Sequence, residues 1–168
     1  TRMKSELPKV LHSIGGKPMV AHVLDTAREL GAERIHVVVG HGASQVADAV
    51  ASPDVETYVQ SEQLGTGHAA LQAAPACYAD STVLILFGDV PLLSAGVLAD
   101  VVSAADAQPT LLAATLEDPT GYGRVIRNTD GSFARVVEQK DGLPHELEVT
   151  EVNTGVLADR GSELVAWL

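Results

Sequence analysis

Positive charge is concentrated in the first 17 residues of a chain that is acidic overall. Four of its 11 Lys and Arg residues lie there, with Glu6 as the only acid among them, while the formal net charge of the 168 residues is −11. These four cations are Arg2, Lys4, Lys9 and Lys17. A local cluster of cations on an acidic background is suited to binding a small polyanion such as a run of phosphates. The alternative is a solvated basic turn, and composition leaves both interpretations open.

Asp89 follows the most apolar run of the chain, residues 83–87, which has the length of a buried strand. If this run is a central strand, the carboxylate emerges at the edge of the sheet where ligands bind. A single carboxylate can hold Mg²⁺ when substrate phosphates and water complete the coordination shell. Alternatively, Asp89 only stabilises the turn of residues 88–91.

A Gly-Thr-Gly turn at residues 65–67 lies between a predicted strand and a predicted helix. Glycines allow backbone amides to approach a ligand, and the start of a helix favours negative charge. The alternative is a tight connection in which Thr66 caps the helix. Gln60, Glu62 and Gln63, just before the turn, could read the edge of a base or simply form a polar strand end.

Three later segments, residues 121–124, 137–141 and 151–155, place polar groups at the ends of predicted strands. Separately each is typical of a turn, but together they could surround a sugar. Covalent catalysis is not indicated, because the six His residues are scattered and neither Ser94 nor Cys77 has an evident base partner. We interpret the histidines, such as His12, His22 and His68, as helix or turn residues.

These side chains must be positioned by alternating strands and amphipathic helices. The strands are predicted at 35–39, 55–60 and 82–87, and the helices at 18–30, 44–50, 68–74 and after Ser94. This order predicts an α/β protein with a Rossmann-like, doubly wound, mostly parallel sheet whose ligands lie at the carboxyl ends of the strands. We expect Ser44 to cap the second helix.

The pattern changes after Pro109. Residues 110–116 predict a strand, and residues 123–127 and 133–138 predict a β-hairpin that turns at 128–131. Such a small hairpin lobe could shape the pocket of a second substrate. A last strand is expected at 152–157, interrupted at 153–155, and a helix begins at 162.

Composition excludes several classes of protein. The 46% hydrophobic content is sufficient for one core, and no run reaches the roughly 18 apolar residues that span a bilayer, so we expect a soluble protein without membrane insertion. Cys77 is the single cysteine, which excludes an internal disulfide and suggests the reducing cytoplasm. The absence of Lys and Arg between Arg34 and Arg124 argues against binding nucleic acid.

Together these motifs resemble the uridylyltransferase domain of the bacterial bifunctional enzyme that makes UDP-N-acetylglucosamine. The resemblance covers essentially the whole chain, in the expected order. Its motifs are Thr-Arg-Met at 1–3, Leu-Pro-Lys-Val-Leu-His at 7–12, Gln-Leu-Gly-Thr-Gly-His-Ala at 63–69, Gly-Asp-x-Pro-Leu at 88–92, Asp-Pro-x-Gly-Tyr-Gly-Arg at 118–124, Val-Glu-x-Lys-Asp at 137–141 and Glu-Val-Asn-Thr-Gly at 151–155.

The resemblance implies a role for each site residue and a nucleotide-sugar pyrophosphorylase type of fold. Arg2 and Lys9 would bind the triphosphate and act in catalysis, and Asp89 would carry Mg²⁺. Uridine would be held by Gln60, Gly65 and Thr66. The sugar would be faced by Phe87, Gly88, Gly123, Glu138 and Asn153.

The implied reaction is attack by the phosphate of N-acetylglucosamine 1-phosphate on the α-phosphorus of UTP, giving UDP-N-acetylglucosamine and pyrophosphate. It needs no protein nucleophile, since positioning and charge neutralisation are sufficient. The setting implied is cytoplasmic synthesis of peptidoglycan and lipopolysaccharide precursors, a role that would affect cell wall and cell shape. The alternatives are a nucleotidyltransferase for another sugar phosphate and a non-catalytic nucleotide-sugar sensor.

The chain also departs from the family pattern. The Gly-rich segment and first strand expected before Thr1 are missing, as are a later Asn that would join Asp89 at the metal and the acetyltransferase β-helix domain through which the family forms trimers. Residues 1–168 are therefore expected to be a partial nucleotidyltransferase domain that is weak or inactive alone. Many relatives also have Tyr where this chain has Phe87.

Overall fold

The computed structural model describes residues 5–167, so the predicted phosphate ligand Arg2 lies outside the described residues. In chain order the elements are η1 (Lys9–Leu11), β1 (Ser13–Ile14), β2 (Lys17–Pro18), α1 (Met19–Glu29), β3 (Ile35–Val39), α2 (Ala43–Val50), β4 (Val55–Val59), α3 (Thr66–Ala73), η2 (Ala74–Ala76), β5 (Thr82–Ile85), α4 (Ala95–Ala105), β6 (Thr110–Thr115), β7 (Arg124–Arg127), β8 (Phe133–Val137), α5 (Pro144–Leu147), β9 (Glu151–Arg160) and α6 (Gly161–Trp167).

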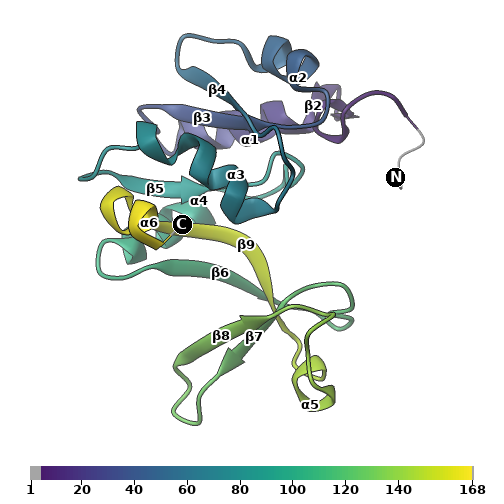
Figure 1. Cartoon of the computed structure of the whole chain (residues 1–168), viewed down its shortest axis with the longest axis vertical. Coiled ribbons are helices and arrows are strands. Elements are labelled where there is room, and N and C mark those ends of the chain that lie inside the picture. The colour runs from purple at the N-terminus through teal and green to yellow at the C-terminus, as the bar shows by residue number, and fades with distance from the viewer. Residues whose placement is uncertain (1–4, 168) are drawn as a thin grey trace.

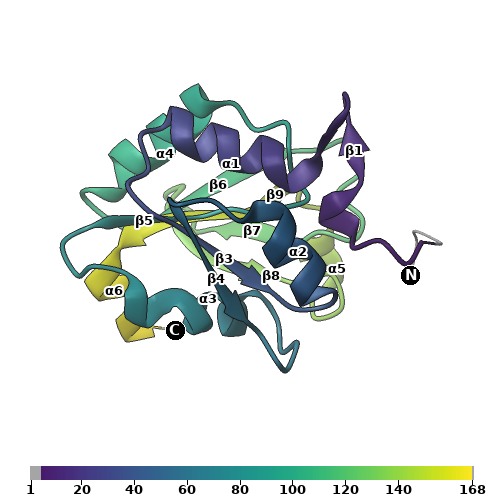
Figure 2. The ribbon, with the colours of Figure 1, turned by 90° about the horizontal axis from the view of Figure 1, so that it is seen from above.

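The molecule has a main body of strands and helices and a smaller lobe of β7, β8 and α5, with the long strand β9 running from one to the other (Figure 1). Helices cover both faces of the main body. Figure 2 shows α1 and α4 on one side of β5 and β9, with α3 and α6 on the other. This arrangement confirms the predicted α/β class with helices on both faces of the strands.

The strand pairing corrects one part of the prediction. Strands β3 and β4 pair in parallel, whereas β5, β6 and β7 each pair with β9 in antiparallel orientation. Strands β7 and β8 form the predicted antiparallel hairpin, and the Gly131 N–H donates to Asn128 O across its turn at 3.0 Å. Within the described residues the strand pairs are therefore mixed and not mostly parallel, because β9 enters the sheet between β5 and β6.

Apolar burial explains why these elements assemble. One core cluster joins Val20 and Leu24 of α1 to Val39 of β3 and Val46 and Val50 of α2. A second cluster packs α4 on the sheet through residues that are at least 94% buried, namely Val101, Ala105 and Ala158. Removal of this apolar surface from water is the main force that holds the helices on the strands.

The small lobe leaves and re-enters the main body at adjacent points, since the Leu116 N–H donates to Thr150 O at 3.0 Å. Its hairpin is tied to β9 by Arg127, whose guanidinium nitrogens contact the Glu151 carboxylate at 2.5 and 2.8 Å. These hydrogen bonds from Arg127 hold the pKa of the Glu151 carboxyl below its usual range. The lobe is therefore anchored on the strand that it shares with the main body.

Two capping predictions are wrong. Helix α2 begins at Ala43, one residue before Ser44, and its N-cap is Gly42 at φ 67° without a side-chain cap. The alternative in which Thr66 caps α3 also fails, because Thr66 is the first helical residue and Gly65 is the N-cap at φ 108°. Ser94 does cap α4, where its Oγ accepts from the Val97 N–H at 3.4 Å. In α2 and α3 a glycine's conformational freedom starts the helix where a side-chain acceptor was expected.

Within residues 5–167, no helix is both long and apolar enough to cross a membrane.

Candidate functional site

Lys9 and Asp89, which are 80 residues apart in the sequence, form an ion pair with 2.5 Å between Nζ and Oδ2. Both groups reach solvent, since the Lys9 side chain is 60% exposed and that of Asp89 is 31% exposed. Such an ion pair is weak and exchangeable in water. The predicted phosphate ligand and the predicted metal ligand therefore lie together on an accessible surface.

Gly88 lies where η1 packs closely against the segment that follows β5. A Cβ placed on Gly88 would lie 3.3 Å from Val10 Cγ1 and 3.6 Å from Val20 Cγ2. The first of these distances is tighter than an ordinary van der Waals contact. Gly88 is thus a close-packed residue next to Asp89 in the chain and against Val10, the neighbour of Lys9.

Strand β9 is continuous from Glu151 to Arg160, so the predicted interruption at residues 153–155 is wrong as a break in the strand. The irregularity is nevertheless present as a bulge: between the pairs Leu111–Leu157 and Ala113–Asn153, one residue of β6 lies opposite three residues of β9. Side chains replace the missing ladder bonds: Asn153 Oδ1 accepts from the Gly155 N–H at 2.7 Å, and Thr154 Oγ1 donates to Leu112 O at 2.6 Å. The bulge therefore fixes the orientation of the Asn153 amide.

Three of the predicted sugar-facing residues lie side by side. The Asn153 N–H donates to Gly123 O at 2.8 Å. A Cβ on Gly123 would lie 3.2 Å from Glu138 Oε1 and only 2.9 Å from Val136 Cγ1, so the carboxylate lies over a position that has no room for a side chain. The cluster of Gly123, Glu138 and Asn153 thus combines donors and acceptors in a form that could bind hydroxyl or amide groups.

Phe87 connects this cluster to the segment that carries Asp89, because its ring lies against Gly155. A Cβ on Gly155 would be 2.4 Å from Phe87 Cε2 and 2.7 Å from Cζ, and Gly155 has a φ of 81°. Only glycine satisfies both conditions at low cost. The ring is therefore positioned between the Asn153 bulge of β9 and the residues that lead to Asp89.

Replacing Gly155 with Ala should destabilise the protein. The methyl group would overlap the Phe87 ring, and an alanine is strained at positive φ, so we expect the free energy of unfolding to fall by about 2–4 kcal/mol. Urea denaturation measures the change. Gly96→Ala is the matched control, because Gly96 lies in α4 with open space around its Cβ position and should be neutral or slightly stabilising. Equal effects of the two substitutions would contradict this account of the Phe87 contact.

The predicted uridine residues form a separate cluster at the start of α3. Gln60 Nε2 donates to Gly65 O at 3.0 Å and lies 3.0 Å from His68 Nδ1. Thr66 is exposed in the first turn of the helix. Among residues 5–167, no hydrogen bond or ion pair joins this cluster to the pair of Lys9 and Asp89.

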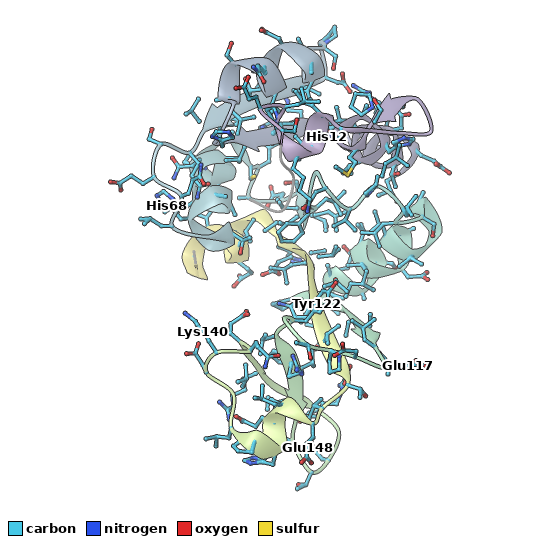
Figure 3. All side chains as sticks on the ribbon, turned by 90° about the vertical axis from the view of Figure 1, so that its right-hand side faces the viewer. His12, His68, Glu117, Tyr122, Lys140 and Glu148 are labelled. Carbon is cyan, nitrogen blue, oxygen red and sulfur yellow. The ribbon has the colours of Figure 1, made fainter. Side chains whose placement is uncertain are left out.

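Figure 3 shows how these regions are arranged. His12, directly after η1, and His68 in α3 belong to the main body, whereas Tyr122 and Lys140 mark the predicted sugar loops on the part of the lobe nearest the main body. Glu148 lies at the far end of the lobe. The loops predicted to bind a sugar therefore face the body that carries the other predicted site residues.

The residues of the site could hold a metal ion only together with a ligand. Within the part of the chain that the structure describes, no three His, Cys, Asp or Glu side chains are grouped so that they could bind a metal. Asp89 supplies one accessible carboxylate. This donor set fits Mg²⁺, which commonly takes one or two carboxylates and completes its shell with substrate phosphates and water.

Sequence reasoning missed the contacts that hold the loops predicted to bind a sugar in place. Arg124 is only 2% exposed, and its Nη2 donates to Gln139 Oε1 at 2.9 Å, while Nη1 donates to Tyr122 O. The same Gln139 oxygen accepts from the Gly121 N–H at 3.1 Å. A buried arginine is unusual enough to signal a structural role, but only the fold shows that it joins the two loops.

Comparison with known proteins gives two sequence findings. A family described as the MobA-like NTP transferase domain matches residues 1–138. The bifunctional protein GlmU of Burkholderia orbicola (strain MC0-3) is 52% identical over 168 residues, and GlmU of Cellvibrio japonicus (strain Ueda107) is 51% identical over 169. These alignments cover 99% and 100% of this chain and 37% of each relative, so the chain spans just over a third of the length of either GlmU protein.

Among solved structures, the chain resembles HddC from Yersinia pseudotuberculosis, with a TM-score of 0.72 at 18% identity. The match covers 98% of this chain and 72% of HddC. A second HddC structure, complexed with GMP-PN, matches with a TM-score of 0.71 at 20% identity over 99% of this chain and 75% of that one. At these identities the likeness concerns the fold.

Proposed function

Because this chain belongs to the family of MobA-like NTP transferase domains, whose pattern matches residues 1–138, we propose that it transfers a uridylyl group from UTP to N-acetylglucosamine 1-phosphate. The products would be UDP-N-acetylglucosamine and pyrophosphate. The choice of these substrates within the family is supported by the identity of about half of the residues to GlmU proteins across essentially the whole chain. The proposed setting is cytoplasmic synthesis of cell-wall precursors.

The observation that carries the proposal is the pairing of Lys9 with Asp89 at 2.5 Å. Nucleotidyl transfer brings two anions together and increases negative charge on the phosphates. A lysine and a metal-binding carboxylate on one accessible surface provide the means to neutralise that charge. No protein nucleophile is required, since the acceptor phosphate itself attacks.

Each group of residues has a distinct role in this proposal. Lys9, together with Arg2, binds the triphosphate, and Asp89 holds the Mg²⁺ that would withdraw charge from the phosphates. Gln60, Gly65 and Thr66 hold the uridine, while the cluster of Gly123, Glu138 and Asn153 binds the sugar. Since Asn153 Oδ1 is already occupied by the Gly155 N–H, the amide presents its NH₂ group as a donor to the acceptor substrate.

Phe87 and Gly88 are proposed to line the pocket between the two substrates. Phe87 supplies an apolar ring against Gly155, beside the bulge that carries Asn153. Where a tyrosine hydroxyl would offer a hydrogen bond, a phenylalanine contributes only packing. Gly88 maintains the close approach of Val10 and so the position of Lys9.

The proposal is tested by pyrophosphate release from the full-length protein that carries this sequence. We expect release with UTP and N-acetylglucosamine 1-phosphate only when Mg²⁺ is present. A panel of other nucleoside triphosphates and sugar 1-phosphates, assayed with and without the metal, distinguishes this reaction from transfer to another sugar. Absence of Mg²⁺-dependent release across the whole panel would exclude a transferase, and binding of nucleotide sugars without turnover would favour a sensor.

A further inference from the structure

The side-chain amide of Gln60 has both of its N–H groups engaged within the protein. Its Nε2 lies 3.0 Å from Gly65 O and 3.0 Å from His68 Nδ1. A carbonyl oxygen can only accept, so the Gln60 atom that faces Gly65 must be the NH₂ group, and this chemistry fixes the orientation of the amide. Gly65 O is itself fixed, because it also accepts from the Ala69 N–H at 3.1 Å in the first turn of α3.

The orientation of Gln60 determines the tautomer of His68. Since the Gln60 NH₂ group donates toward Nδ1, this ring nitrogen must be the acceptor, and the neutral imidazole carries its proton on Nε2. One turn later, Gln72 Nε2 donates to His68 O at 3.0 Å. The Gln72 NH₂ group also lies 3.4 Å from the ring Nε2, but with the proton on Nε2 this contact joins two donors and is not a hydrogen bond, so the shorter contact with Gln60 decides the tautomer. The ring of His68 is partly buried, so it is a fixed support for Gln60.

Within the described residues, Oε1 is the one atom of the Gln60 side-chain amide that is left to bind a ligand. Among residues 5–167, no protein group donates to Gln60 Oε1. An acceptor at this position would match a base edge that presents an N–H, as uracil and thymine do at N3. It would repel cytosine, whose N3 is an acceptor, and discrimination of this kind is strong where a site holds fixed polar groups.

We infer that His68 is a positioning residue that gives the nucleotide site its preference for uracil or thymine over cytosine. The inference rests on the proposed function, because it presumes that Gln60 faces the base. In this proposal His68 does not touch the base. His68 Nδ1 and Gly65 O together hold the Gln60 amide with its oxygen directed outward, and without the His68 acceptor a single bond to Gly65 O restrains the amide.

The test compares substitutions at His68 in the full-length protein. His68→Leu removes the acceptor, and the ratio of kcat/KM for UTP to that for CTP should fall by about tenfold, the change expected from the loss of one neutral hydrogen bond. His68→Asn should keep most of the wild-type ratio, because its Oδ1 supplies an acceptor near the position of Nδ1. Calorimetry with UTP and CTP should rank the wild type and the two variants in the same order by their preference for UTP, and it does not depend on turnover.

Leu71→Ala is the matched control, since Leu71 is an exposed apolar residue of the same helix and its loss should leave the ratio unchanged. If His68→Leu lowers the melting temperature, His68→Phe repeats the comparison with a ring that has no acceptor nitrogen. The inference is overturned if His68→Leu and His68→Phe both keep the wild-type ratio of UTP to CTP. It is also overturned if His68→Asn loses this ratio as fully as His68→Leu, or if the wild type prefers CTP. A wild type that neither binds nor converts any nucleotide would instead refute the proposed function, and the inference with it.

Discussion

Asp89→Asn should reduce kcat for pyrophosphate release by about 100- to 1,000-fold, the loss typical when one charged or hydrogen-bonding group that stabilises a transition state is removed. Asparagine has nearly the same shape as aspartate but carries no charge, so it is a poor ligand for Mg²⁺. Asp89 is partly exposed, and its substitution should leave the fold intact. Steady-state assays over a range of Mg²⁺ concentrations measure the effect, and the residual activity should need more metal.

The control for Asp89→Asn is Asp100→Asn, which removes the same charge from an exposed position on α4. It should leave kcat and the dependence on Mg²⁺ unchanged. Thermal melts of both variants exclude unfolding as the cause of lost activity. If Asp89→Asn retained wild-type kcat at the same Mg²⁺ concentration, Asp89 would not be the metal ligand and would be a turn residue, as its position in residues 88–91 also allows.

Lys9→Ala should weaken UTP binding by about 10- to 100-fold, the range expected for the loss of a hydrogen bond to a charged group. The affinity for N-acetylglucosamine 1-phosphate should change much less, because Lys9 lies beside Asp89 and no described contact links it to Gly123, Glu138 or Asn153. Calorimetry with each substrate separately gives both values.

Asn153→Ala should have the opposite effect to Lys9→Ala: it should affect the sugar phosphate and not UTP. It removes the NH₂ donor from the proposed sugar cluster, so the KM for the sugar phosphate should rise by about tenfold while the affinity for UTP is retained. Lys17→Ala is the control for charge, since Lys17 pairs with Asp25 on α1 and not with Asp89. This division of the site would be wrong if Lys9→Ala lost equal affinity for both substrates. It would also be wrong if Asn153→Ala changed the binding of UTP alone.

Local sequence patterns were sufficient to predict most of the elements. Helix α1 begins at Met19, one residue after the predicted start at Pro18, which is its N-cap, and the chain leaves it through Gly31 at φ 80°, as the stop signal predicts. Strand β3 has the predicted bounds, residues 35–39, and the hairpin turns where its Asn, Asp and Gly residues lie. These features depend on residues that are close together in the chain.

The order of the strands could not be predicted in the same way. Strand β9 comes last before α6, yet it pairs with β5, β6 and β7, which are distant in sequence. Its hydrophobic pattern shows that it is buried but not which neighbours it has or in which direction they run. The expectation of a mostly parallel sheet failed for this reason.

The candidate site shows the same limit. Lys9 and Asp89 could each be selected from sequence, but their ion pair joins residues that are 80 positions apart, which the fold brings together where Val10 packs against Gly88. His68 was interpreted as a helix residue, which is correct, but its contact with Gln60 gives it a further role that only the fold makes visible. The roles of the site residues in binding remain predictions that the variants above can test.

The two ends of the small lobe have a consequence for engineering the protein. Since Leu116 and Thr150 are joined by a hydrogen bond, residues 117–149 leave the main body and return to it at adjacent points, and Gly123 and Arg127 bond this segment to β9. A segment with adjacent ends can be exchanged for a counterpart of different length without moving the chain on either side. The lobe therefore behaves as an interchangeable part: a transplant from a relative with another acceptor sugar should carry Gly123 and Glu138 with it, while Lys9, Asp89 and the whole of β9 remain in the recipient.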